Sequence, residues 1–250
     1  MLRAIPILVK RIISTLIPSL AFLLAVYLGV AAYADRNAPN ERIYVTGLGK
    51  KDFVSDLIVW EGSFSRQERE LKSAYAALAR DQNTVKTYLV EMGLEEEEIL
   101  FSSVDISKEF DYSYTPQGNR ISTFVGYRLS QRVEIESQAV EKVEQISRQI
   151  TELINRGVEF YSFAPQYYYT QLSQLKLEMI AAATEDATQR AAGIADKAGA
   201  ELGELKQARM GIFQIIGQHS NEDYSWGGTF NTADKMKTAT ITMRLEFGLD

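Results

Sequence analysis

The first apolar pattern along the chain is an uncharged run over residues 12–34. It follows Lys10 and Arg11 and ends just before Asp35. About 20 apolar residues are enough to span a bilayer as a helix. Positive residues flanking such a helix stay on the cytoplasmic side. We therefore expect a single-pass helix in the inner (cytoplasmic) membrane, with the N-terminus inside and the body in the periplasm or another extracytoplasmic space.

A cleaved signal peptide is the alternative for this segment. Ala32-Tyr33-Ala34 fits an A-x-A cleavage site, but the apolar run exceeds the usual signal core of about 7–15 residues. Both interpretations place the body outside the cytoplasm. The predicted organisation is an anchor or signal over 1–34, a polar linker over 35–41, and one domain over 42–250.

Beyond the linker, some segments have an apolar residue at every second position and others have one about every 3.6 residues. This pattern predicts strands alternating with helices. Strands are predicted at 43–46, 54–64, 99–110, 123–135, 158–164, 205–216 and 238–247, and helices at 66–92, 137–155 and 170–199. The order ββαββαβαββ indicates an α+β fold in which helices cover a largely antiparallel sheet.

Each predicted element presents an apolar face to a common core. The second strand offers Ile58, Trp60 and Phe64, and the first helix offers Leu71, Tyr75, Leu78, Val85, Leu89 and Met92. In the longest helix, a stripe of small residues predicts close packing on a sheet: Ala183, Ala187, Ala191, Ile194 and Ala198. The last strand points Ala239, Ile241, Met243, Leu245 and Phe247 inward, with Thr240, Thr242, Arg244 and Glu246 outward.

Charge and composition exclude several functions. The net charge is −6, and residues 1–34 hold three bases and no acid, so the rest of the chain carries −9. An acidic body argues against nucleic-acid binding, which needs a basic face. The chain has no cysteine and one histidine, His219, which rules out thiolate chemistry and a multi-histidine metal site within one chain.

Two motifs that suggest ligand chemistry do not support it on inspection. Gly47-Leu48-Gly49-Lys50 lacks the remaining residues of a phosphate-binding loop, so we predict a tight turn between two strands. The consecutive acids Glu95, Glu96, Glu97 and Glu98 lack the alternation that a calcium loop needs and predict a solvated acidic corner. The sequence predicts no catalytic residue, no metal site and no cofactor.

Aromatic residues outside the periodic stripes are the remaining candidates for function. Tyr112 and Tyr114 are expected in a loop. The candidate interface residues are Tyr167, Tyr168, Tyr169, Tyr224, Trp226 and Phe230. Clustered tyrosine and tryptophan outside a core favour protein interfaces, although partial burial within the protein's own loops would explain them equally well.

Four motifs together resemble the SIMPL-domain family of bacterial periplasmic and envelope proteins. They are 43–49, similar to an opening V-T-G-x-G; Gly126-Tyr127-Arg128-Leu129; the alanine-rich 184–205 closing on Gly199 and Leu202-Gly203; and the alternating terminal strand. The resemblance covers about residue 42 to the C-terminus. It implies a mixed α/β fold without established catalytic activity.

The resembled family includes a protein linked to oxidative-stress defence and an antigen that assembles into a large hollow homo-oligomer. We therefore expect a non-catalytic, membrane-anchored envelope protein that acts through self-association, with a role in stress protection. The alternative is a periplasmic binding module for a small molecule or a cell-wall fragment. The expected partners are further copies of the chain and the membrane, with no nucleic acid.

Overall fold

The computed structural model describes residues 19–30, 33, 42–221, 225 and 227–249. Residues 19–30 are helical with exposed side chains. Among the described residues, no helix is both long and apolar enough to cross a membrane. The predicted linker over 35–41, and residues 12–18, 31–32 and 34 of the predicted spanning segment, lie outside the described residues.

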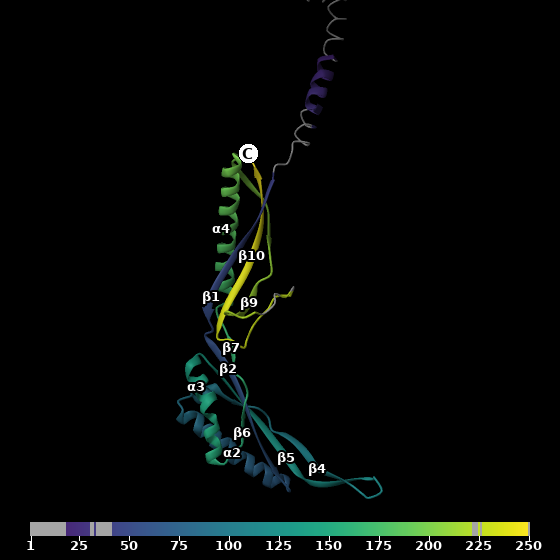
Figure 1. Cartoon of the computed structure of the whole chain (residues 1–250), viewed down its shortest axis with the longest axis vertical. Coiled ribbons are helices and arrows are strands. Elements are labelled where there is room, and N and C mark those ends of the chain that lie inside the picture. The colour runs from purple at the N-terminus through teal and green to yellow at the C-terminus, as the bar shows by residue number, and fades with distance from the viewer. Residues whose placement is uncertain (1–18, 31–32, 34–41, 222–224, 226, 250) are drawn as a thin grey trace, which may run out of the picture. The chain divides into compact units, whose positions relative to one another are not determined.

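The domain is a mixture of helices and antiparallel strands, as the sequence predicts in outline (Figure 1). The helices are α2 (Leu71–Glu91), α3 (Val140–Gln149) and α4 (Leu172–Ala198), with 3₁₀ helices at Glu96–Glu98 and Ile150–Arg156. The strands are β1 (Arg42–Val54), β2 (Leu57–Glu68), β3 (Ile99–Phe101), β4 (Asp105–Tyr114), β5 (Arg120–Ser137), β6 (Phe160–Ser162), β7 (Gln166–Tyr168), β8 (Leu202–Met210), β9 (Gln214–Gly217) and β10 (Met236–Leu249).

Contacts within the chain group it into two compact units. The larger unit consists of residues 46–187 and 209–244, and the smaller takes the described residues that remain. The predicted single domain over 42–250 covers the larger unit and the part of the smaller unit that follows residue 41.

A six-stranded sheet forms the larger unit's main core. Its strands follow the order β3-β5-β2-β6, with β4 beside β5 and β7 beside β2. β2 supplies the predicted Ile58, Trp60 and Phe64, which are fully or almost fully buried. They pack with apolar side chains of α2, α3 and β5. Trp60 also donates a hydrogen bond from its ring nitrogen to the Ser162 hydroxyl at 3.0 Å.

The second sheet has four strands in the order β1-β10-β8, with β9 also paired to β10. All five inward residues predicted for the last strand are buried. Two residues predicted to point outward, Thr240 and Glu246, are buried as well. Glu246 is satisfied by an ion pair with Arg42.

The glycines Gly47 and Gly49 do not form the predicted turn; they lie inside β1. Neither has a positive φ. They alternate with exposed residues and face α4, where a Cβ on Gly47 would lie 2.0 Å from the Ala183 carbonyl oxygen. A Cβ on Gly49 would lie 2.4 Å from the Met179 carbonyl oxygen. The glycines are needed because strand and helix backbones approach so closely, not because the chain turns.

α4, the helix that faces these glycines, bears the predicted stripe of buried alanines, except near its C-terminal end. Ala183, Ala187 and Ala191 are completely buried, and Ala195 continues the stripe in place of the predicted Ile194 and Ala198, which are exposed. The stripe keeps a spacing of four residues throughout, which on a helix stays on one face. Small side chains along it let α4 lie against β1.

In α2 the predicted stripe is confirmed at Leu78, Val85 and Leu89, which are buried, but not along its whole length. Leu71 and Tyr75 are exposed, whereas Ala74, Asp81 and Tyr88 are buried. The prediction followed the largest apolar side chains, but small residues face the sheet where the helix approaches it. Asp81 occupies a place on the buried stripe because Arg66 pairs with it.

Several element boundaries differ from the predicted ones. Residues 66–68 belong to β2 rather than to the first helix, and the predicted strand 99–110 is two strands, β3 and β4. The predicted strand 205–216 is likewise divided into β8 and β9. β7 has no predicted counterpart, and Tyr112 and Tyr114 lie in β4 rather than in a loop. Short strands carry too few alternating positions to give a periodic signal.

Candidate functional site

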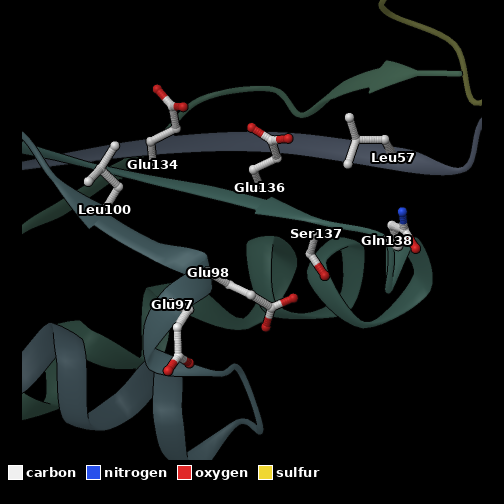
Figure 2. Close-up of a pocket in the computed structure, with 8 residues that line it drawn as sticks. All are labelled: Leu57, Glu97, Glu98, Leu100, Glu134, Glu136, Ser137 and Gln138. Atoms are coloured by element: carbon white, nitrogen blue, oxygen red, sulfur yellow. The ribbon is translucent and has the colours of Figure 1, made fainter. Parts of the chain in front are cut away.

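An open acidic groove of about 590 Å³ lies in the larger unit (Figure 2). Glu134 and Glu136 line it from β5, and Glu97 and Glu98 line it from the 3₁₀ helix. Leu57 and Leu100 supply its apolar part. The predicted solvated corner at 95–98 is therefore part of its wall, and Glu95, Glu96 and Glu97 are exposed there.

The carboxylates of this groove do not converge on one point. Figure 2 shows Glu134 and Glu136 pointing away from Glu97 and Glu98. The Glu98 carboxylate already has a partner at the start of its own 3₁₀ helix, because it accepts a hydrogen bond from the Glu95 backbone N–H at 2.9 Å. Across the described chain, no group of three His, Cys, Asp or Glu side chains is placed to hold a metal ion.

The second candidate site is a two-stranded antiparallel ribbon. It consists of β4 and residues 115–126, and we call it the arm. β4 pairs with β5 from Asp105↔Ser130 to Tyr114↔Arg120. β2 pairs with β5 only as far as Tyr127, so the arm extends beyond the sheet (Figure 1). No helix covers it in Figure 1, and each of its strands has an open edge along this part.

A β-bulge marks the point where the arm leaves the sheet. The register shifts between Glu109 and Phe110, and Val125 is the extra residue on β5. Gly126 beside it has φ 152°, and a Cβ there would lie 2.5 Å from the Glu68 carbonyl oxygen. A bulge bends and twists a strand, so this glycine allows β5 to turn away from the end of β2.

One face of the arm, the aromatic face, is formed by Lys108, Phe110, Tyr112, Tyr114, Arg120 and Phe124. Cross-strand partners share a face, and ring contacts confirm the assignment. The Phe110 and Phe124 ring centroids are 5.7 Å apart, and the Arg120 guanidinium lies 3.8 Å above the Tyr112 ring. Tyr112 is 50% exposed and Tyr114 is 70% exposed, so the aromatic surface is open to solvent.

The opposite face, the acidic face, carries Asp105, Ser107, Glu109, Asp111, Ser113 and Ile121. Arg128, just beyond the arm, pairs with Glu109 at 3.1 Å. Asp105 and Asp111 have no ion-pair partner among the described residues. The arm is therefore basic and aromatic on one side and acidic on the other.

The predicted interface residue Tyr167 is tied into the fold. It lies in β7, half-buried, and its hydroxyl donates to the Glu144 carboxylate at 2.8 Å. Lys235 binds the other oxygen of the same carboxylate at 3.0 Å. The buried Lys237 ammonium donates to the Tyr167 backbone carbonyl. Burial, and then the hydrogen bond to Glu144, raise the pKa of the Tyr167 phenol to about 12.

The other predicted interface residues are dispersed. Tyr168 donates its hydroxyl to Gln166 at 2.6 Å, and Tyr169 packs on Phe53 with ring centroids 4.8 Å apart. Phe230 is half-exposed, with its ring 5.8 Å from the Lys237 ammonium. Tyr224 and Trp226 lie outside the described residues. Whether any of the six contacts another chain stays a prediction.

We expect the Tyr167 hydroxyl to make the protein sensitive to alkali. An unfolded tyrosine has a pKa of about 10, so the unfolded chain loses this proton first, and stability falls between about pH 10 and about pH 12. Urea unfolding at increasing pH should show a shallower loss for Tyr167→Phe than for wild type. Tyr168→Phe, the matched control, should follow wild type; equal slopes for all three proteins would contradict this assignment.

The sequence marks Tyr112 and Tyr114 as notable aromatic residues but places them in a loop, because the predicted strand ends at residue 110; it does not predict that they share a strand face with Phe110. The usable signal was the spacing of two between Phe110, Tyr112 and Tyr114. In a strand this spacing places all three on one face. The absence of a helix above them could not be predicted from that pattern.

Comparison with known proteins agrees with the motifs of the sequence. The family model of SIMPL, described as a protein of unknown function (DUF541), matches residues 43–245. A search of curated proteins finds no match. Because the family match covers nearly the whole of the described body, from the first strand to the last, this chain belongs to the SIMPL family.

Proposed function

We propose that this chain is a non-catalytic envelope protein that is held at the inner membrane by residues 12–34 and acts through self-association outside the cytoplasm. The observation that carries the proposal is the arm, whose aromatic face is exposed along its length. Because the family includes a protein linked to oxidative-stress defence, envelope stress protection is the setting that we propose for this association.

Exposed apolar surface of this kind needs a partner. Isolated apolar residues are normal on a protein surface, but a contiguous patch marks an interaction site. A two-stranded ribbon by itself is marginally stable in water, and its open edges favour pairing with another chain. Covering the aromatic face of the arm would stabilise the arm and remove these rings from water.

Anchoring would assist such an association. The charge-free run behind Lys10 and Arg11 fixes orientation by the positive-inside rule. Chains held in one membrane meet at a higher effective concentration than free chains. The acidic body opposes association by repulsion, so screening by salt should favour it.

The alternative function, capture of a small molecule or cell-wall fragment, has its best place in the acidic groove. Small-molecule sites usually combine an apolar enclosure with a few convergent polar groups. The carboxylates of this groove diverge (Figure 2), which favours the arm over the groove as the working surface.

The proposal is tested with two differently tagged copies of the full-length chain in the same cells. Both copies should stay in the membrane pellet after a carbonate wash and should co-purify after detergent extraction. A soluble product beginning at Asp35 would show that residues 1–34 are a cleaved signal peptide and not an anchor. Failure of the two tags to co-purify at any salt concentration would contradict self-association.

A further inference from the structure

The two faces of the arm carry opposite charge. Lys108 and Arg120 lie on the aromatic face, which has no acid. Asp105, Glu109 and Asp111 lie on the acidic face, and Arg128 offsets one of these charges through Glu109. The division follows from strand alternation, because neighbouring residues point to opposite sides.

We propose that arms of neighbouring copies stack front to back, with the aromatic face of one arm on the acidic face of the next. This inference rests on the proposed self-association and specifies its geometry. In this arrangement the bases of one copy face the carboxylates of the other. Tyr112 and Tyr114 then cover Ile121 of the neighbouring arm, which is itself 46% exposed.

The same-face arrangements are disfavoured by charge. Stacking two aromatic faces would bring Lys108 and Arg120 of each copy together, and stacking two acidic faces would bring the carboxylates together. Joining two β4 edges so that each face continues into the same face of the next copy would also bring acids beside acids, and like charges directly opposite each other in a sheet are destabilising. Only opposite faces combine apolar contact with complementary charge.

The available area is compatible with this contact. An aromatic side chain can bury about 150–250 Å². The four rings of the aromatic face are exposed by between 37% (Phe124) and 70% (Tyr114). The rings alone then supply roughly 400 Å², about half of the roughly 800 Å² per partner found in stable interfaces. Ile106 and Ile121, also exposed, and the strand backbones add to this area.

A front-to-back contact uses a different surface on each partner. Contacts of this kind propagate from copy to copy and form a ring if the rotation closes, or an open chain if it does not. A two-fold dimer through the arm, in contrast, would use the same face twice. The geometry of the arm contact therefore decides whether assembly stops at two copies.

Single cysteines test the arrangement cleanly, because the chain has none of its own. Ser122, opposite Tyr112, lies on the aromatic face, and Ser113, opposite Ile121, lies on the acidic face. Both serines are exposed, so Ser122→Cys and Ser113→Cys are mild, matched changes. Stacked sheets lie about 10 Å apart, so a thiol crosslinker of about that length is the appropriate probe.

Full-length chains with each cysteine are co-expressed under different tags and crosslinked in membranes. We expect the mixed Ser122→Cys and Ser113→Cys pair to crosslink several-fold more than either variant with itself. Predominant same-face crosslinking, or no crosslinking while the tagged copies still co-purify, would overturn the front-to-back geometry and leave the proposed function standing. Loss of co-purification in wild type would instead contradict the proposed function.

Charge reversal gives a second, independent readout. Arg120→Glu alone and Asp111→Arg alone should each reduce co-purification several-fold. Mixing the two variants should restore it, because every contact in an alternating assembly then joins a base to an acid. Co-purification of either single variant at the wild-type level, or no recovery on mixing, would contradict the stacking.

Discussion

Replacing Gly47 by alanine is expected to lower the free energy of unfolding by about 3 kcal/mol or more. Overpacking a core usually costs about 1–3 kcal/mol. Here the added methyl would lie 2.0 Å from the Ala183 carbonyl oxygen and 2.5 Å from the Ala187 backbone nitrogen. Both are backbone atoms of α4, so no side-chain rotation relieves the contact. Urea unfolding of the variant measures the loss.

Gly193 provides the control for this substitution. It lies in α4 itself, and nothing stands within 4 Å of the position that its Cβ would take. Gly193→Ala should raise stability by up to about 1 kcal/mol, because alanine favours a helix over glycine. If Gly47→Ala is as stable as wild type, α4 does not lie against β1 as described.

Replacing Asp81 by alanine is expected to cost about 3 kcal/mol. Asp81 is buried on α2 and receives two hydrogen bonds from the Arg66 guanidinium at the end of β2, one of them 2.9 Å long. Arg66 also donates to the Gly157 carbonyl oxygen, which follows the 3₁₀ helix. Removing one partner of a buried ion pair costs about 3–5 kcal/mol of stability. Because Arg66 is partly exposed, we expect a loss at the lower end of this range.

A surface pair on the same helix is the matched comparison. Glu91, at the end of α2, binds Arg156 at 2.8 Å, and both side chains are well exposed. Glu91→Ala should change stability by less than about 1 kcal/mol, because solvent screens such pairs. Equal losses for the Asp81 and Glu91 variants, measured by urea unfolding, would contradict a special role for Arg66 and Asp81 in joining β2 to α2.

The sequence predicts those parts of the fold that depend on local periodicity. Ile58, Trp60 and Phe64 alternate along β2 and are buried as predicted, and the alanines of α4 keep their spacing. Gly157 ends its helix in the left-handed conformation, with φ 81°. Each of these features is decided by residues within a few positions of one another.

The errors arise where distant segments decide the outcome. Glycines after a short β run usually signal a turn, and only the presence of α4 above Gly47 explains a continuing strand. The same applies to the arm: its alternating aromatic residues resemble a core face until the lack of a covering helix is known. The sequence cannot decide between an interface and the protein's own fold for Tyr167, because its partner Glu144 is distant in sequence.

In the function that we propose, the arm holds copies of this protein together. The most direct test is the mass of the detergent-solubilised full-length chain, measured by light scattering at low and moderate salt. Tyr112→Ser/Tyr114→Ser removes two exposed rings from the aromatic face, and Tyr75→Ser removes an exposed ring from α2 as a control. We predict multimers for wild type and for Tyr75→Ser, and monomers for the arm variant. Multimers of equal mass for all three proteins would contradict the claim.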